Sequence, residues 1–352
     1  MKLLILGGTE FAGRAVTESA LARGWDVTVF HRGRHAAPDG VTSRIGDRTA
    51  EDGGGLAALA DGAWDLVVDT WSGAPSAVRD TARLLAGRVG RYAYVSSCSV
   101  YVWPPAAGYD ESAPVVMGSP DAGDVPYAEA KRGGELAVLD AIGEGRSLLV
   151  RSGLILGPWE NIGRLPWWLG RIARGGDVLA PGPRETPLQF VDVRDLADWT
   201  LDAAEAGLNG PYNLASEPGH TTMGELLEAC VAVTGSAARL RWTPAEAILA
   251  AGVAPWSDLP IWVPWSDPAH GALHGLGVGR ALAAGLRCRP AGDTVKDTWS
   301  WLTSIGGTAP QRPDRPRVGL AREVELRWAL LRGLVARRSG HARHPSGSAC
   351  TG

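Results

Sequence analysis

The run Lys2-Leu3-Leu4-Ile5-Leu6-Gly7-Gly8-Thr9-Glu10-Phe11-Ala12-Gly13 opens the chain and sets the architecture that the later residues complete. Its first part is apolar without periodicity, which is typical of a parallel strand buried on both faces. Residues 14–23 then carry apolar side chains at helical spacing, and residues 27–30 form a second apolar run. A helix that begins at a glycine turn offers free N–H groups to a pyrophosphate, so we predict a strand–turn–helix–strand unit that binds a dinucleotide.

Two features of this unit depart from a simple NAD site. Glu10 occupies the middle glycine position of a G-x-x-G-x-x-G turn, where its side chain would crowd and repel a pyrophosphate. The second strand ends in His31-Arg32-Gly33-Arg34, without the acid that would bond a ribose 2′-hydroxyl. Since a guanidinium group suits a 2′-phosphate, we expect NADP as cofactor, with NAD as the alternative. A βαβ unit that has lost its nucleotide is the other interpretation.

Composition limits the class of protein. The 352 residues are 45% hydrophobic with a formal net charge of −3, enough for a large core. We see no apolar run of membrane-spanning length and no signal peptide, and therefore expect a cytoplasmic protein. The scattered cysteines form no ligand cluster, so we expect no metal site. Several tryptophans fall in loops, which favours a pocket. We predict that this substrate pocket is lined by Trp71, Ser99, Trp159, Trp167 and Trp262.

Strands and helices alternate along the first half of the chain, with further apolar runs at 65–69, 91–95 and 148–150. This order predicts an α/β fold, a doubly wound parallel sheet of the Rossmann type with a smaller C-terminal substrate lobe. We predict a dinucleotide-binding domain at 1–157, to which 187–215 returns, and a lobe formed by 158–186 and 216–310. Residues 311–352 read as a basic C-terminal helix and a disordered tail.

A tyrosine and a lysine lie four residues apart, Tyr127 and Lys131, within a predicted helix at 127–142. That spacing places both side chains on one helix face, where the ammonium group favours the phenolate. Such a tyrosine can exchange a proton with a carbonyl or an alcohol near neutral pH. Ser97, at the end of the preceding strand, would hold the same oxygen atom. The alternative is a surface helix whose lysine extends toward solvent.

Taken together, these motifs resemble the extended short-chain dehydrogenase/reductases, the NAD-dependent epimerase/dehydratase family, over roughly residues 1–305. Within that family the chain is most similar to actinobacterial reductase-like members, whose glycine turn reads GGT-acidic-F and whose second strand ends in an arginine. The resemblance is carried by the glycine turn, Val95-Ser96-Ser97-Cys98-Ser99-Val100-Tyr101, Tyr127 with Lys131, Arg151 with Gly157-Pro158, and Asp192-Val193-Arg194-Asp195-Leu196-Ala197.

The resemblance implies a catalytic group of Ser97, Tyr127 and Lys131. It also implies cofactor contacts from Gly7, Thr9, Glu10, Phe11, Gly13, Arg32, Asp47, Thr70, Ser96 and Lys131. Three departures narrow the activity. The acid that sugar-nucleotide dehydratases place after the catalytic serine is missing, Leu154 replaces a frequent asparagine, and 187–189 lacks the arginine that would hold a nucleotide diphosphate.

We therefore expect an NADP(H)-dependent reductase or dehydrogenase that acts on a carbonyl or secondary alcohol of a small, fairly apolar molecule. One alternative is an NAD-dependent sugar or sugar-nucleotide epimerase that uses the same group. Another is a non-catalytic, dinucleotide-sensing or RNA-binding relative, against which the intact Ser97, Tyr127 and Lys131 argue. We expect a small-molecule substrate, no membrane or nucleic-acid partner, and a monomer or homodimer.

Overall fold

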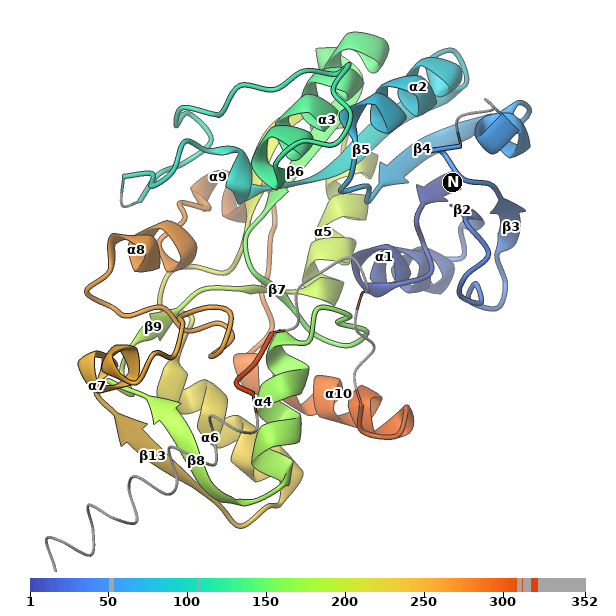
Figure 1. Ribbon diagram of the computed structural model, residues 1–352. Helices are drawn as coiled ribbons and strands as arrows, with labels where there is room; N and C mark the ends of the chain where they lie inside the picture. Colours follow the sequence, from blue (N-terminus) through green and yellow to red (C-terminus); the bar gives the residue numbers. More distant parts are fainter. Residues whose placement is uncertain (51–53, 107, 309–311, 313–317, 322–352) are drawn as a thin grey trace, which may run out of the picture.

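The structure, a computed structural model, describes residues 1–50, 54–106, 108–308, 312 and 318–321 (Figure 1). Apart from residues 312 and 318–321, the predicted C-terminal helix and tail at 311–352 lie outside the described residues. None of the helices in the described part of the chain combines the length and apolarity needed to span a bilayer.

A seven-stranded sheet, in the order β3-β2-β1-β4-β5-β6-β11, forms the centre of the larger domain, and every neighbouring pair is parallel. Its strands are β1 (Lys2–Leu6), β2 (Asp26–His31), β3 (Thr42–Ile45), β4 (Trp64–Asp69), β5 (Val89–Ser97), β6 (Ser147–Ser152) and β11 (Gly210–Leu214). β1 lies inside the sheet between β2 and β4, as its uninterrupted apolar run requires. The predicted doubly wound α/β fold is confirmed.

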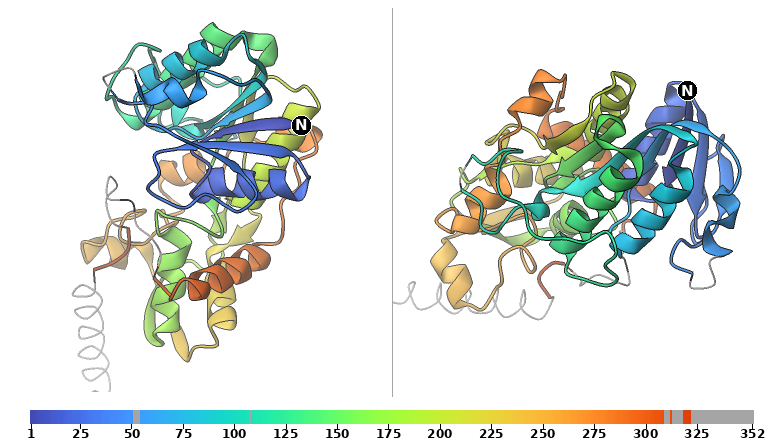
Figure 2. Two further views of the ribbon diagram at one scale, coloured as in Figure 1. Left: turned by 90° about the vertical axis from the view of Figure 1, so that its right-hand side faces the viewer. Right: turned by 90° about the horizontal axis from the view of Figure 1, so that it is seen from above.

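Helices cover both faces of this sheet (Figure 2). α1 (Phe11–Ala22) packs beside α5 (Val193–Glu205) on one face, and α2 (Pro75–Leu85) packs beside α3 (Tyr127–Ile142) on the other. Leu3 and Ile5 of β1 belong to the apolar cluster under α1 and α5. Leu4 and Leu6 point the other way, into the cluster under α2 and α3. Three 3₁₀ helices complete the connections: η1 (Gly54–Leu59), η2 (Cys98–Val100) and η3 (Glu144–Arg146).

A smaller lobe with its own apolar core lies beyond the sheet and appears at the bottom of Figure 1. Its centre is a parallel two-stranded ladder of β8 (Gly176–Pro181) and β13 (Ala238–Thr243). The remaining lobe helices are α4 (Arg164–Ala173), α6 (Met223–Thr234), α7 (Ala245–Ala250), α8 (Pro268–His274) and α10 (Ala291–Ser304).

Two short strand pairs connect the lobe to the larger domain: β7 (Ile155–Leu156) with β10 (Val191–Asp192), and β9 (Pro187–Leu188) with β12 (Thr221–Thr222). Within the predicted lobe segment, α9 (Gly279–Ala283) instead packs against β11 of the large sheet. The domain boundaries themselves stay a prediction.

Candidate active site

The glycine turn lies at the carboxyl end of β1, where the strand order reverses between β1 and β4. Gly7 adopts φ +97°, and a Cβ atom on Gly13 would lie 2.1 Å from the Gly7 carbonyl oxygen. α1 therefore approaches the turn more closely than any side chain at position 13 would allow. Thr70, at the end of β4, donates a hydrogen bond from Oγ1 to the Leu6 carbonyl oxygen at 3.0 Å. This close approach of helix to strand suits a pyrophosphate at the helix N-terminus.

Glu10 replaces a glycine in this turn, and its carboxylate is held by two loops. Asn161 Nδ2 donates to Glu10 Oε1 at 3.1 Å, and His35 Nε2 lies 3.5 Å from the same oxygen. Neither contact carried a sequence signal, since the two partners come from distant loops. Thr9 and Phe11 flank Glu10 in the turn, and Phe11 adopts φ +37°. The negative charge expected to repel a pyrophosphate is thus engaged by Asn161 and His35.

Two exposed guanidinium groups follow β2 at positions 32 and 34. Among the described residues, neither Arg32 nor Arg34 forms an ion pair. Asp47 accepts hydrogen bonds from the Thr49 amide at 3.0 Å and the Thr49 hydroxyl at 2.6 Å. These bonds, and then the two arginines, lower the pKa of Asp47 below its ordinary value. The end of β2 therefore offers two exposed guanidinium groups within the electrostatic reach of Asp47.

Lys131 is almost completely buried, at 3% exposure, one helical turn after Tyr127. Its ammonium group donates to the Trp71 carbonyl at 2.5 Å and to the Val95 carbonyl at 2.7 Å. Nζ also lies 4.9 Å from the centre of the Tyr94 ring. These acceptors, at the ends of β4 and β5, stabilise the charged amine in a buried position. Tyr127 begins α3 and is 38% exposed, so its ring borders solvent or a bound molecule.

Ser97 is the last residue of β5, and its hydroxyl donates to Ser99 Oγ at 3.1 Å. α3 packs against both β5 and η2, which follows Ser97. The structure thus positions Ser97, Tyr127 and Lys131 on directly contacting elements at one edge of the sheet. The ability of Ser97 and Tyr127 to reach one substrate oxygen stays a prediction.

Beneath this site lies a buried ionic network that sequence reasoning missed. Glu135 is fully buried, and it accepts bonds from Arg151 Nε at 2.8 Å and Nη2 at 3.0 Å. The Ser96 hydroxyl donates to the same carboxylate at 2.8 Å, which commits the Ser96 side chain to the network. Arg151 Nη1 also donates a hydrogen bond to the Tyr101 hydroxyl oxygen at 3.2 Å, which makes Tyr101 the fourth member of the network. The signal was present in the sequence, since Glu135 follows Lys131 by one helical turn.

A second buried ion pair supports the residue that holds Lys131. Arg48 and Asp69 form a bidentate pair at 2.8 and 3.0 Å, and Tyr92 donates to Asp69 at 2.7 Å. Asp69 Oδ1 also accepts the Trp71 backbone N–H at 2.9 Å, and Arg48 lies 5.2 Å from the Trp71 ring centre. Burial raises the pKa of Tyr92 well above its ordinary value. The pair therefore fixes Trp71, whose carbonyl receives Lys131.

Comparison with known proteins identifies the family to which the chain belongs. The sequence profile of the NAD dependent epimerase/dehydratase family matches residues 3–215, more than half of the chain. The chain belongs to this family. As a member, it is an enzyme of the extended short-chain dehydrogenase/reductase type. No curated protein matches the chain in sequence.

Solved structures of similar fold are distant in sequence. A UDP-galactose 4-epimerase has a TM-score of 0.61 at 16% identity, covering 87% of this chain and all of its own. The Bordetella bronchiseptica enzyme WbmH, solved with NAD+, has a TM-score of 0.63 at 19% identity over 87% of this chain and 99% of its own. TunA, an NAD dependent NDP-hexosamine 5,6-dehydratase, has a TM-score of 0.60 at 19% identity, covering 86% of this chain and 98% of its own. At these identities the likeness shows the fold alone.

In this epimerase/dehydratase family member, the tryptophans predicted to line a pocket are divided among three apolar clusters. Trp71 packs in the cluster under α2 and α3, Trp159 in the cluster under α1 and α5, and both Trp167 and Trp262 in the lobe core. The backbone of Trp159 adopts φ +64°. The Arg14 guanidinium group lies over the Trp159 ring, 5.9 Å from the ring centre. Trp167 packs edge-on against Trp168 at 4.7 Å, and Trp262 is fully buried in the lobe core. Trp71 is partly buried and Ser99 is exposed, both at strand ends of the large sheet. Their contact with a substrate stays a prediction.

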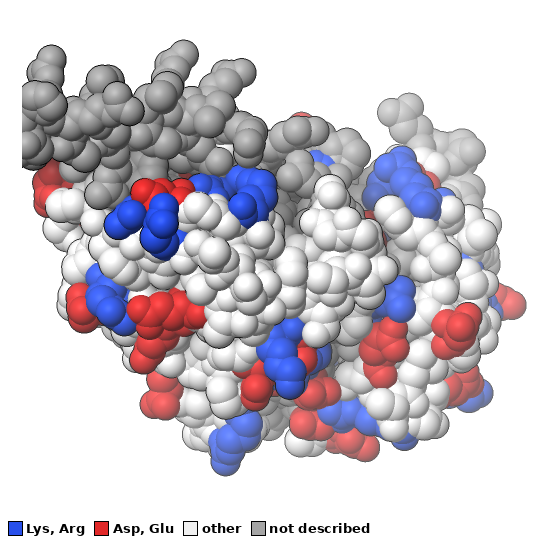
Figure 3. Space-filling view, turned by 90° about the horizontal axis from the view of Figure 1, so that it is seen from below, with Lys and Arg blue, Asp and Glu red and all other residues white. Residues whose placement is uncertain are grey.

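Charged side chains of both signs are interspersed on the face seen from below (Figure 3). The described residues of that face form no extended basic surface of the kind that binds nucleic acid. The described residues also contain no group of three or more His, Cys, Asp and Glu side chains that could hold a metal ion.

Proposed function

We propose that this family member is an NADP(H)-dependent reductase or dehydrogenase. It moves a hydride between the nicotinamide and a carbonyl or secondary-alcohol carbon of a small, fairly apolar molecule. The observation that carries the catalytic part is the buried Lys131 ammonium group, fixed by two carbonyls one helical turn from Tyr127.

The residues at the carboxyl ends of β1 and β2 fit such a cofactor. Gly13 permits the close approach of α1, and Glu10 is engaged by Asn161 rather than projecting freely into the turn. Arg32 and Arg34 would bind the adenosine 2′-phosphate, because they are exposed and have no ion-pair partner among the described residues. When bound, the nicotinamide supplies or accepts the hydride.

The protein side chains handle the proton. Tyr127 gives a proton to the carbonyl oxygen during reduction and takes it back during oxidation. Lys131 places a positive charge on the same helix, one turn from Tyr127, and would bond the nicotinamide ribose. Ser97 orients the substrate oxygen by a hydrogen bond. These roles require the Tyr127 and Ser97 hydroxyls to face one another across a bound substrate.

A sugar-nucleotide epimerase is the second candidate, favoured by the family assignment and by the named activity of the UDP-galactose 4-epimerase. The stretch that would bind a nucleotide diphosphate argues against it. Leu188 is fully buried. The side-chain amide nitrogen of Gln189 already donates hydrogen bonds to the Ser216 and Leu276 carbonyls, at 2.7 and 2.8 Å. These side chains leave no free donor for a diphosphate.

The test begins with the dinucleotide that co-purifies with the protein, released by denaturation and identified by mass spectrometry. We expect NADP(H), and consumption of NADPH with at least one member of a panel of aromatic and aliphatic ketones and aldehydes. Tyr127→Phe protein serves as the matched control for the panel. Tightly held NAD⁺, together with interconversion of nucleotide sugars without net cofactor consumption, would instead establish the epimerase.

A further inference from the structure

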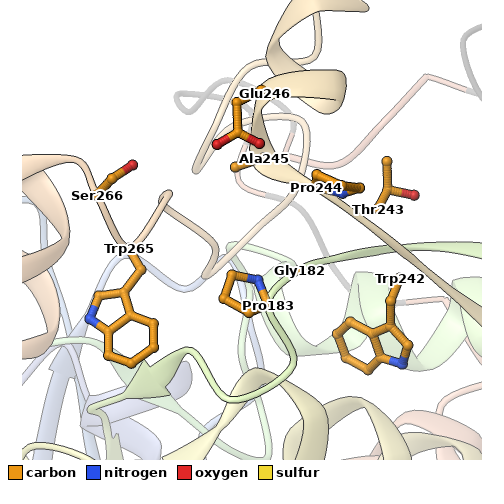
Figure 4. A pocket seen from close by; sticks show the side chains of 9 residues that line it. All are labelled: Gly182, Pro183, Trp242, Thr243, Pro244, Ala245, Glu246, Trp265 and Ser266. Atoms are coloured by element: carbon orange, nitrogen blue, oxygen red, sulfur yellow. The ribbon is translucent and has the colours of Figure 1, made fainter.

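A separate cavity of about 750 Å³ opens in the lobe at the carboxyl ends of β8 and β13 (Figure 4). Its volume falls in the range of small-molecule sites. Its walls include two indole rings, Trp242 and Trp265, with Pro183 between them. Trp265 is 52% exposed, and an exposed aromatic ring beside a cavity is typical of a binding surface.

The backbone that carries these walls is fixed by regular structure. Trp242 belongs to β13, which pairs with β8 along its whole length. The ladder continues one residue past the end of β8, since the Gly182 backbone N–H donates to the carbonyl of Thr243, the last residue of β13, at 2.8 Å. Asp267 caps α8 two residues after Trp265, with Oδ1 accepting the Ala269 amide at 2.8 Å. The two indoles thus project from anchored segments, which favours a preformed site.

One carboxylate faces this aromatic cavity. Glu246 lies above Pro183 in Figure 4, with its oxygens directed toward the space between the two indoles. Among the described residues it makes no ion pair and no hydrogen bond. The nearby cations are engaged elsewhere: Arg184 with Glu228 at 2.5 Å, and Arg241 with Asp177 at 3.1 Å.

No Arg or Lys of the described chain lies over either indole face. An aromatic ring carries negative potential on its face, and a carboxylate adds a full negative charge. A cavity with two such faces and an unpaired carboxylate is therefore complementary to a cation whose remaining surface is apolar. The lining of the cavity contains no Arg or Lys side chain that would attract an anion.

We propose that this cavity binds an organic ammonium ion, with the charged nitrogen between Trp242, Trp265 and Glu246 and the apolar remainder against Pro183. A quaternary ammonium group fits best, because it has no N–H group to satisfy and gains from the aromatic faces. Ser97, Tyr127 and Lys131 do not line the cavity. The binding is thus independent of hydride transfer, and each can fail without the other.

The test compares two molecules of the same shape, choline and the neutral 3,3-dimethylbutan-1-ol, titrated into the full-length protein. Binding is followed by tryptophan fluorescence and by ligand-observed NMR. We expect choline to bind about tenfold more tightly than its neutral counterpart. Glu246→Gln should weaken choline binding by about tenfold and leave the alcohol unchanged, because only the charge is removed.

Two further variants separate the cavity from its surroundings. Trp265→Leu should weaken choline binding while NADP⁺ affinity stays unchanged, since the exposed ring is not needed for the fold. Glu185→Gln, at an exposed position on the neighbouring loop, should have no effect. Equal affinity for choline and the alcohol, or unchanged choline binding in Glu246→Gln, would overturn the proposal and leave Glu246 as a partner of the α7 N-terminus alone. Choline binding that survives in both Glu246→Gln and Trp265→Leu would place the cation elsewhere.

Discussion

Lys131 combines full burial with a positive charge, and such a group is stable only where its donors are satisfied. The Trp71 and Val95 carbonyls satisfy two of them. The Trp71 carbonyl lies just beyond β4 and the Val95 carbonyl lies within β5, so the ammonium group is held against the sheet. Tyr127 lies on the first turn of α3, and its role as the proton donor stays a prediction.

Removing the phenol hydroxyl tests this role directly. Tyr127→Phe should lower turnover by about 10²–10⁴, the usual contribution of general acid–base catalysis, and leave NADP⁺ affinity unchanged. Lys131→Ala should reduce both turnover and affinity, because the same ammonium group would bond the ribose. Turnover of the substrate found by panel screening and fluorescence titration of NADP⁺ provide the measurements. Tyr212→Phe, at a buried tyrosine of β11, is the control. Full activity in Tyr127→Phe would exclude it as the proton donor.

The choice between NADP and NAD is also set by single residues. Arg32→Asp replaces a cation by the kind of side chain that bonds a ribose 2′-hydroxyl, so the affinity ratio should shift toward NAD by at least about tenfold. Calorimetric titration with both cofactors measures the ratio. Arg83→Asp, on the exposed side of α2, controls for net charge. An unchanged ratio in Arg32→Asp, or equal binding of both cofactors by the wild type, contradicts NADP specificity.

At the scale of the elements, the loop after β3 and the end of β4 are joined by the Arg48–Asp69 pair. Both side chains are buried, at 5% and 0% exposure. A buried ion pair contributes little net stability compared with apolar residues of similar size. Loss of one partner, however, leaves the other charge buried without a counter-charge. Because Asp69 also accepts the Trp71 amide, the pair orients the strand end from which Lys131 is held.

Arg48→Met should therefore lower the free energy of unfolding by about 3–5 kcal/mol. Combining it with Asp69→Asn should restore part of that loss, because no charge is then left unpaired. Urea denaturation of the two variants measures the difference. Arg44→Met provides the comparison, since Arg44 pairs with the largely exposed Asp61 and its loss leaves no buried charge unpaired, so it should cost clearly less. Equal effects of Arg48→Met and Arg44→Met would refute the expected cost of burial.

At the scale of the whole molecule, His274 lies where several segments meet. Its Nδ1 accepts a hydrogen bond from the backbone N–H of Gln189 at 3.1 Å, and its Nε2 lies 3.0 Å from the Ile261 carbonyl oxygen. With the acceptor role at Nδ1, Nε2 carries the proton and the imidazole is neutral. In the same helix, α8, the Ala272 carbonyl oxygen accepts a hydrogen bond from the Tyr109 hydroxyl at 2.8 Å. Protonation of His274 would therefore disturb the connection between the two parts of the molecule.

Burial, with a smaller effect of His270, lowers the pKa of His274 to about 4, below its ordinary value of 6.5. Between these values the unfolded chain binds more protons than the folded one. The folded state should therefore lose stability as the pH falls from 6.5 to 4, by up to about 3 kcal/mol. His274→Gln should be less stable at pH 8 and should lack this part of the pH dependence.

Chemical denaturation across pH 4–8 measures this effect. Burial raises the pKa of Glu160 to about 7, so that residue changes stability in the opposite sense. Because Glu160 is present in both proteins, the difference between the two curves isolates His274. Parallel curves for wild type and His274→Gln would show that the histidine does not titrate in this range.

The sequence alone was sufficient to predict those elements that depend only on residues close together in the chain. The apolar run at 2–6, the glycine turn and the helical spacing after it predicted β1 and α1, both confirmed. The four-residue interval also placed Tyr127 and Lys131 on adjacent turns of one helix. β3, by contrast, was not predicted, because a mostly exposed edge strand carries no apolar pattern.

Apart from β3, the strands, turn and helices of residues 2–142 are thus encoded locally, because period and turn chemistry depend only on near neighbours in the chain. The partners of the functional groups depend instead on topology. Asn161 reaches Glu10 across 151 positions, and Lys131 bonds to Trp71 across 60. The cavity at the carboxyl ends of β8 and β13 likewise exists only because two distant strands pair in parallel. No local spacing encodes such contacts, since they form only after the sheet and the lobe have brought remote segments together.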